Sequence, residues 1–167
     1  MGDSAITIVA IFLAAILMFV FPLMTMADKT DDTAKLTVQT ATTEFTDNIR
    51  LSGKITQSAY DNLIQRIEPP TKNTYEIEIV VQKLDENPAK KSADTRIGDN
   101  VYYTMYTTQV LESLPLNLKE GDIVSVSVKN TNTTIASQLR NFLFKVTGNE
   151  TSTITAQSSG VVTKTAN

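Results

Sequence analysis

The pattern of apolar positions changes once within the N-terminal third of the chain. From Ala5 to Ala27 the residues are uncharged and mostly apolar on every side, and Asp28 follows directly. About 23 such residues in a helix reach the ~30 Å thickness of a bilayer's hydrocarbon core. The sequence therefore predicts a membrane-anchoring helix. Pro22 predicts a local kink in it, because proline lacks an N–H and crowds the carbonyl of Met18.

Helical periodicity continues beyond this stretch, but only on one side of the helix. Apolar residues recur at spacings of three and four, at Ala34, Val38, Ala41, Phe45 and Ile49. The pattern predicts that the same helix continues as an amphipathic extension to about Ser52 and ends at Gly53. A helix of this length measures roughly 70 Å, which suits a handle joined to a domain.

The rest of the chain alternates between helical and strand periodicity. Further helices are predicted over residues 56–67 with Thr56 as N-cap, over 107–114, and over 135–146 with Thr133 or Thr134 as N-cap. Strands are predicted over residues 74–84, 101–104 and 123–129, with one or two more around Gly160. Residues 85–100 lack periodicity and predict an exposed loop.

These elements predict an α+β fold in three parts. Residues 1–27 form the hydrophobic helix, residues 28–52 its amphipathic extension, and residues 53–167 an extracytoplasmic head of antiparallel strands and short helices. In the last helix the spacing predicts an inward face of Ile135, Leu139, Phe142, Leu143 and Val146, with Arg140 and Lys145 outward.

The amino-acid composition excludes several classes of function. The chain has 15 basic and 18 acidic residues, a net charge of −3, and neither Cys nor His. Without these two residue types, thiolate nucleophiles, disulfides, imidazole catalysis and the usual zinc sites are excluded. No basic stripe is present that would suit nucleic acid. We expect a protein that is not an enzyme and that carries no cofactor.

Charges beside the apolar stretch do not decide its orientation, since neither end has a basic excess. The extracytoplasmic placement of the head is instead inferred from its Thr-rich, Cys-free composition.

Other candidate chemistry has simpler interpretations. The acidic residues of the 85–100 loop do not follow the spacing of a calcium-binding loop, and their basic neighbours favour a solvated loop. Glu76 and Glu78 share one strand face, which is typical of the solvent side of a sheet. Tyr102, Tyr103 and Tyr106 are interpreted most simply as core residues, and alternatively as an exposed contact patch of the head.

Several segments carry a resemblance to a known family. They are Gly2-Asp3-Ser4-Ala5 before the apolar stretch, FTDNIRLSGKITQSAYDNLIQRI at residues 45–67, LRNFLF at 139–144 and SSGVVT at 158–163. With the helix-then-head layout, this resembles type IV pilin-like subunits, specifically tight-adherence (TadE-like) pilins and related small pilin-like proteins of Gram-positive bacteria.

The resemblance implies processing and assembly. A prepilin peptidase would cut after Gly2 and leave Asp3 as the first residue. Thr7 stands where such pilins usually carry a glutamate, so that Asp3, near the positive end of the helix dipole, is the candidate substitute for that acid.

The chain is thus expected to be a structural subunit that polymerises into a surface filament or a pilus-like apparatus for adhesion or secretion. An apolar helix can be surrounded by lipid or by identical helices, and Ala10, Ala14 and Ala15 would permit close helix approach. The expected partners are other copies of the chain, other pilin-like subunits, and membrane lipid before assembly. The alternative is a single-pass anchored extracytoplasmic binding or accessory module that does not polymerise.

Overall fold

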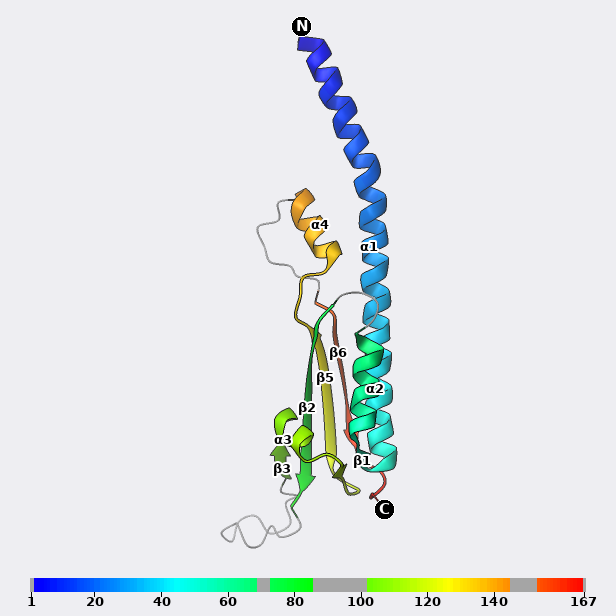
Figure 1. Ribbon diagram of the computed structural model, residues 1–167, viewed down its shortest axis with the longest axis vertical. Helices are drawn as coiled ribbons and strands as arrows, with labels where there is room; N and C mark the ends of the chain where they lie inside the picture. Colours follow the sequence, from blue (N-terminus) through cyan, green and yellow to red (C-terminus); the bar gives the residue numbers. More distant parts are fainter. Residues whose placement is uncertain (1, 69–72, 86–101, 145–152, 167) are drawn as a thin grey trace.

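A computed structural model describes residues 2–68, 73–85, 102–144 and 153–166, and shows one long helix with a small head on its C-terminal half (Figure 1). The helix, α1, spans Gly2–Ser52 and contains 51 residues, so the predicted continuous helix is confirmed. It runs through Pro22 without a break. In Figure 1 its blue N-terminal part leans away from the axis of its cyan part.

Gly53 ends α1 for two physical reasons. Its φ of +68° lies in the left-handed region, and its N–H donates to the carbonyl of Ile49 at 2.8 Å, as at many helix C-termini. A Cβ atom at this position would also lie 2.3 Å from the carbonyl oxygen of Lys164. The glycine therefore lets the C-terminal tail pass close to the end of the helix.

The head is built around a four-stranded antiparallel sheet with the order β3-β2-β5-β6. The strands span Tyr75–Leu84 (β2), Tyr102–Met105 (β3), Ile123–Asn130 (β5) and Thr155–Val161 (β6). The bounds of β2, β3 and β5 were predicted to within one residue, and β6 is one strand where one or two were predicted around Gly160. A two-stranded ribbon, which was not predicted, joins β1 (Lys54–Ile55) to β4 (Leu116–Asn117) at the foot of α1.

One face of the sheet packs against α1, with α2 (Gln57–Ile67) beside it. The predicted apolar stripe of α1 is confirmed, since its five residues from Ala34 to Ile49 are all buried in the core. Val124, Val126 and Val128 of β5 face this stripe. Glu76 and Glu78, on the opposite face of β2, are exposed, as the alternating pattern predicted.

The shorter helices also follow the prediction in outline. Thr56 caps α2, because its side chain accepts from the N–H of Ala59 at 3.2 Å. Helix α3 spans Thr107–Glu112 and buries Val110, while α4 spans Ile135–Phe144. Thr134 is the cap of α4, since its hydroxyl accepts from the N–H of Ser137 at 3.3 Å.

The predicted inward face of α4 is wrong at Ile135, which is 73% exposed. Ala136 and Ser137 are buried instead, because α4 packs its first turn against α1 and these small side chains allow close approach. Leu139 is half-buried and Arg140 exposed, in agreement with the prediction. The side chains of residues 142–144, as well as Lys145 and Val146, lie outside the described part.

Candidate functional site

The most distinctive surface of the molecule is the N-terminal half of α1, residues 3–27, here called the bare helix. As far as Phe19 its large apolar side chains are exposed on all sides, and Met18, for example, is 76% exposed; Val20 and Met24 are half-buried. Within the described part of the chain, α1 is the one helix long and apolar enough to cross a membrane. None of its most apolar stretch is buried. Such a surface requires lipid or protein around it.

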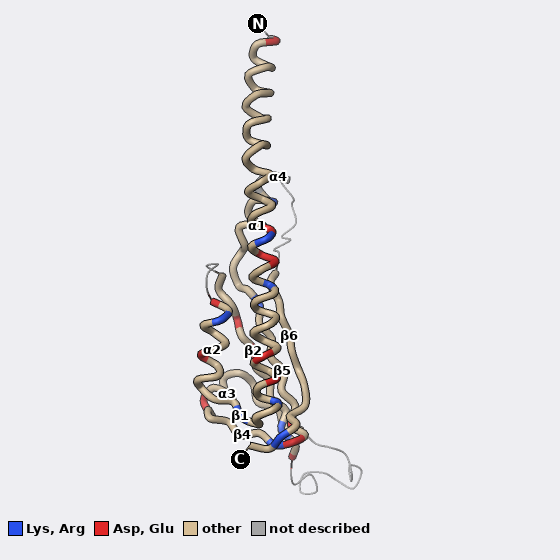
Figure 2. Tube along the Cα trace, turned by 90° about the vertical axis from the view of Figure 1, so that its right-hand side faces the viewer, with Lys and Arg blue, Asp and Glu red and all other residues tan. Residues whose placement is uncertain are grey.

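Charge is confined to the two ends of the bare helix. Figure 2 shows acidic colour at the N-terminus of α1 and then uncharged chain until the helix reaches the level of α4. Asp3 lies in the first turn, where a negative charge interacts favourably with the helix dipole. Asp28 is the first charged residue after it. The length between these charges matches a hydrocarbon layer.

The possible processing site, Gly2 and Asp3, lies at the start of α1, and Gly2 is already helical. Thr7 is one turn further on, and its hydroxyl donates to the carbonyl of Asp3 at 2.8 Å. This hydrogen bond satisfies the Thr7 side chain within its own helix, which suits an apolar environment. Thr7 therefore supplies no charge at the position where the resembling family carries a glutamate.

The proposed assembly residues Ala10, Ala14 and Ala15 are exposed on the bare helix. Ala10 and Ala14 are one turn apart and so share a face, where small side chains would let a second helix approach. Pro22 is also exposed and lies between this face and the head. All four residues thus lie exposed on α1.

Tyr102, Tyr103 and Tyr106 do not form one surface patch. Tyr102 and Tyr103 are successive residues of β3 and point to opposite faces of the sheet. Tyr102 is half-buried and its hydroxyl lies 3.4 Å from the carbonyl oxygen of Gly121. Tyr103 and Tyr106 are exposed, and Tyr106 precedes α3. A contact patch of the head would therefore use Tyr103 and Tyr106 rather than all three.

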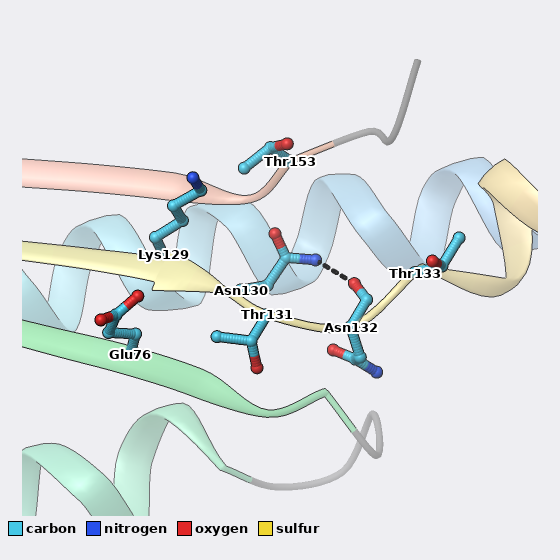
Figure 3. A pocket seen from close by; sticks show the side chains of 7 residues that line it. All are labelled: Glu76, Lys129, Asn130, Thr131, Asn132, Thr133 and Thr153. Carbon is cyan, nitrogen blue, oxygen red and sulfur yellow. Dashed lines mark hydrogen bonds between the residues drawn. The ribbon is translucent and has the colours of Figure 1, made fainter. Parts of the chain in front are cut away.

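A hollow of about 330 Å³ lies on the head where β2 begins and β5 ends (Figure 3). Its polar groups are used in holding the fold. Asn130 donates to the carbonyl of Asn132 at 2.9 Å and accepts from the N–H of Ile154 at 2.8 Å. Glu76 and Lys129 are cross-strand partners on the exposed face. Among the described residues that line the hollow, no hydrogen bond joins a nucleophile to a base in the arrangement that catalysis needs.

The loop acids contribute no site to the described part. Glu86, Asp94, Asp99 and Asn100 lie outside the described residues, and Asp85 directly follows β2. Among the residues that the structure does describe, no group of three acidic, His or Cys side chains could hold a metal ion. Comparison with known proteins finds no matching family model, no matching curated protein and no matching solved structure.

Sequence reasoning missed the contacts between α4 and α1. The Arg140 guanidinium pairs with Asp28 at 2.6 Å, and the Thr134 hydroxyl donates to Asp31 at 2.6 Å. More than 100 residues separate the partners, so no local pattern signals either contact. They attach α4 to α1 at the point where the bare helix ends.

Proposed function

We propose that the protein is a pilin-like structural subunit. It is held in a membrane by the bare helix before assembly and then polymerises through that helix into a surface filament. The observation that carries the proposal is the division of α1. One half is built into the core of the head, and the other half projects from it with apolar side chains on all sides.

This division suits polymerisation for a physical reason. A filament core can be made by bare helices of many copies packing together, which removes their apolar surface from both water and lipid. Because α1 is continuous, a head would be rigidly positioned relative to the helix that enters the core. The resemblance of residues 45–67 to pilin-like proteins supports the same function.

The first test is electron microscopy of material sheared from the native cells, combined with N-terminal sequencing of this chain in that fraction. Filaments that contain a chain beginning at Asp3 would support a processed, polymerising subunit. An intact chain found only in the membrane fraction would contradict polymerisation and favour the solitary anchored module.

A matched pair of variants tests the small-residue face of the bare helix. Ala14→Phe is expected to reduce filament yield strongly, because the larger side chain keeps neighbouring helices apart. Ala14→Ser preserves the small size and is expected to assemble. The near-ultraviolet circular dichroism of the tyrosines, all of which lie in the head, should be unchanged in both variants. Equal yields of filaments would contradict close packing at Ala14.

A further inference from the structure

The four-stranded sheet of the head has two edge strands, β3 and β6 (Figure 1). All neighbouring strands are antiparallel, so β3 and β6 run in opposite directions. Within the described part of the chain, no further strand pairs with either of them. The free side of an edge strand presents N–H and C=O groups with which the strand of another chain can pair.

The free edge of β6 is open over most of its length. Val162 exchanges hydrogen bonds with the two residues before β5. Because the backbone direction alternates along a strand, the N–H and C=O groups of the odd-numbered residues of β6 point away from β5. One of them, the Val161 carbonyl, accepts from Nε of Arg50 at 3.1 Å. Three others have no hydrogen-bond partner for these groups among the described residues: Thr155, Gln157 and Ser159.

The free edge of β3 is shorter. The N–H of Ile79 on β2 donates at 2.8 Å to the hydroxyl of Thr107, which follows β3, so the odd-numbered residues of β2 direct their backbone groups toward β3. Their partners are the odd-numbered residues of β3. The N–H and C=O groups of Tyr102 and Thr104 therefore point away from the sheet, and no hydrogen bond from the described chain reaches them.

Neither edge carries the residues that usually keep edge strands from pairing. Residues 102–106 and 155–161 contain no charged residue and no proline, which are the common protection of such edges. The chain thus has two unprotected edges that run in opposite directions. When two copies have the same orientation, β3 of one copy is antiparallel to β6 of the other. Copies anchored in one membrane by their bare helices share that orientation.

We propose that the heads of neighbouring copies form one continuous antiparallel sheet, in which the β3 edge of one copy pairs with the β6 edge of the next. The inference rests on the proposed polymerisation and adds a second contact between the same copies. This head-to-tail pairing does not close on two copies, so it can extend along a filament. The few hydrogen bonds of so short a contact are weak alone, but packed bare helices would hold the two edges at a high effective concentration.

The open positions also determine how far neighbouring copies are shifted along the strands. Thr104 and Val161 lie in one row across the sheet. Two copies placed side by side without a shift would set Thr104 opposite Val161, where Arg50 already binds the carbonyl. The pairing therefore requires one copy to move toward the open part of β6.

A shift of four residues, about 14 Å, is the smallest that places both outward residues of β3 opposite open residues of β6. It pairs Thr104 with Gln157 and Tyr102 with Ser159. In both pairs the side chains lie on the outer face of the sheet, away from α1, so the contact is made by the backbone. The register is thus specific enough to test.

The chain has no cysteine, so an introduced pair of thiols reports on one contact. Filaments sheared from native cells that express full-length Thr104→Cys/Gln157→Cys would be oxidised with copper phenanthroline and separated on a non-reducing gel. We expect a ladder of covalent multimers, because paired Cα atoms ~5.5 Å apart suit a disulfide. Within one copy these positions lie on opposite edges of the sheet, at least ~14 Å apart, beyond the reach of a disulfide.

Two control variants separate this contact from others. Glu78→Cys/Gln157→Cys has the same number of thiols on the same face, but Glu78 is on the inner strand β2, so no ladder should form. Gln157→Cys alone should stay monomeric, and dimers from it would overturn the proposal by showing that β6 pairs with itself. Filaments without a ladder would overturn the proposal and leave polymerisation standing. Absence of filaments from cells with the wild-type chain would overturn both.

Two proline variants test the same edge without thiols. Ser159→Pro removes an outward N–H and leaves the hydrogen bonds with β5 intact, so filament yield should fall about fivefold, the effect of one net hydrogen bond on an association constant. Thr155→Pro makes the same change outside the paired segment and should assemble normally. The near-ultraviolet circular dichroism of the tyrosines should be unchanged in both. Equal yields would overturn the pairing at Ser159.

Discussion

Individual residues decide how the C-terminal tail closes the foot of the head. Gly53 is the first, because its positive φ and the nearby Lys164 carbonyl both exclude a side chain. Gly53→Ala is expected to destabilise the head by about 2–5 kcal/mol, since backbone strain of ~1–2 kcal/mol adds to the ~1–3 kcal/mol cost of displacing the tail. Urea denaturation of the full-length protein in detergent micelles, followed by tyrosine circular dichroism, measures the loss.

Gly121 is the matched control for this prediction. Its φ is +98°, but a Cβ atom there would meet nothing within 4 Å. Gly121→Ala should therefore cost only the backbone strain, about 1–2 kcal/mol. Equal losses in the two variants would show that contact with the tail adds nothing at Gly53.

Asp122 is the second deciding residue, a carboxylate buried at the start of β5. It accepts from the N–H of Leu84 at 2.9 Å and from that of Lys119 at 2.8 Å. Asp122→Ala leaves two backbone donors unsatisfied and is expected to cost about 2–5 kcal/mol, measured by the same urea titration. Glu120→Ala, in the same turn and exposed, should change stability by no more than ~0.5 kcal/mol. If Asp122→Ala lowered stability as little as Glu120→Ala, the result would contradict the structural role of the Asp122 carboxylate.

The burial of Asp122 could not be predicted from the sequence. In the sequence it reads as one polar residue of the turn LKEGD. Its burial follows from the position of Leu84, which is 38 residues away in the chain. Gly53 was predicted, because a glycine after a periodic helix is a local signal.

Among the elements, α1 depends on its buried stripe rather than on helix propensity alone. Ile49 is 1% exposed and Leu51 is 65% exposed, although both are large apolar residues near the same helix end. Ile49→Ala is expected to destabilise the head by about 2–5 kcal/mol, through lost burial and a cavity. Leu51→Ala should remain within ~0.5 kcal/mol, again by urea denaturation. Similar losses would contradict the assignment of the core face.

The contact between α1 and α2 is expected to depend on pH. The hydrogen bond and the charge of Arg66 hold the pKa of Glu44 below its ordinary value of 4.5. The ionised form is thus favoured in the folded protein, so the stability that the pair contributes is present above pH 4.5 and is lost as the pH falls through the lowered value. The stability gap between the wild type and Glu44→Gln should be small, because both groups are exposed, and should close on acidification.

Arg66→Gln provides the control for this pH dependence. In that background, Glu44→Gln should produce no gap that changes with pH, because the charge that lowers the Glu44 pKa is gone. Urea denaturation between pH 7 and pH 3 measures the free energy of unfolding of the wild type, the two single variants and the double variant. A gap in the original background that stays constant over this range would contradict the assignment.

The elements differ in how far their patterns predict them. The alternation of β2 and the stripe of α1 are local signals many residues long, and both are confirmed. β1 and β4 have two residues each, too few for any period to show. The contact between Thr134 and Asp31 determines which side of α4 faces α1. The sequence could not predict that side, because this ten-residue helix has apolar residues on several sides.

For the whole molecule, the sequence predicted the layout of the bare helix and the head, and the structure adds how the two are joined. The bare helix and the helix in the core of the head are one continuous helix, so a force on the bare helix is transmitted to the core through Ala34 and Val38. Which side of the membrane the head faces is not encoded in the flanking charges. It stays a prediction that composition and resemblance support.

The absence of cysteine makes this orientation directly measurable. Gln157, an exposed residue of β6, and Ile8, in the bare helix, can each be replaced by Cys. On intact native cells, a membrane-impermeant maleimide should label Gln157→Cys fully, because we propose that the head lies outside the cell. Ile8→Cys should react only after detergent has dissolved the membrane, since lipid or neighbouring helices surround it. Labelling of Gln157→Cys only after cell lysis would place the head in the cytoplasm, where it could not decorate a surface filament.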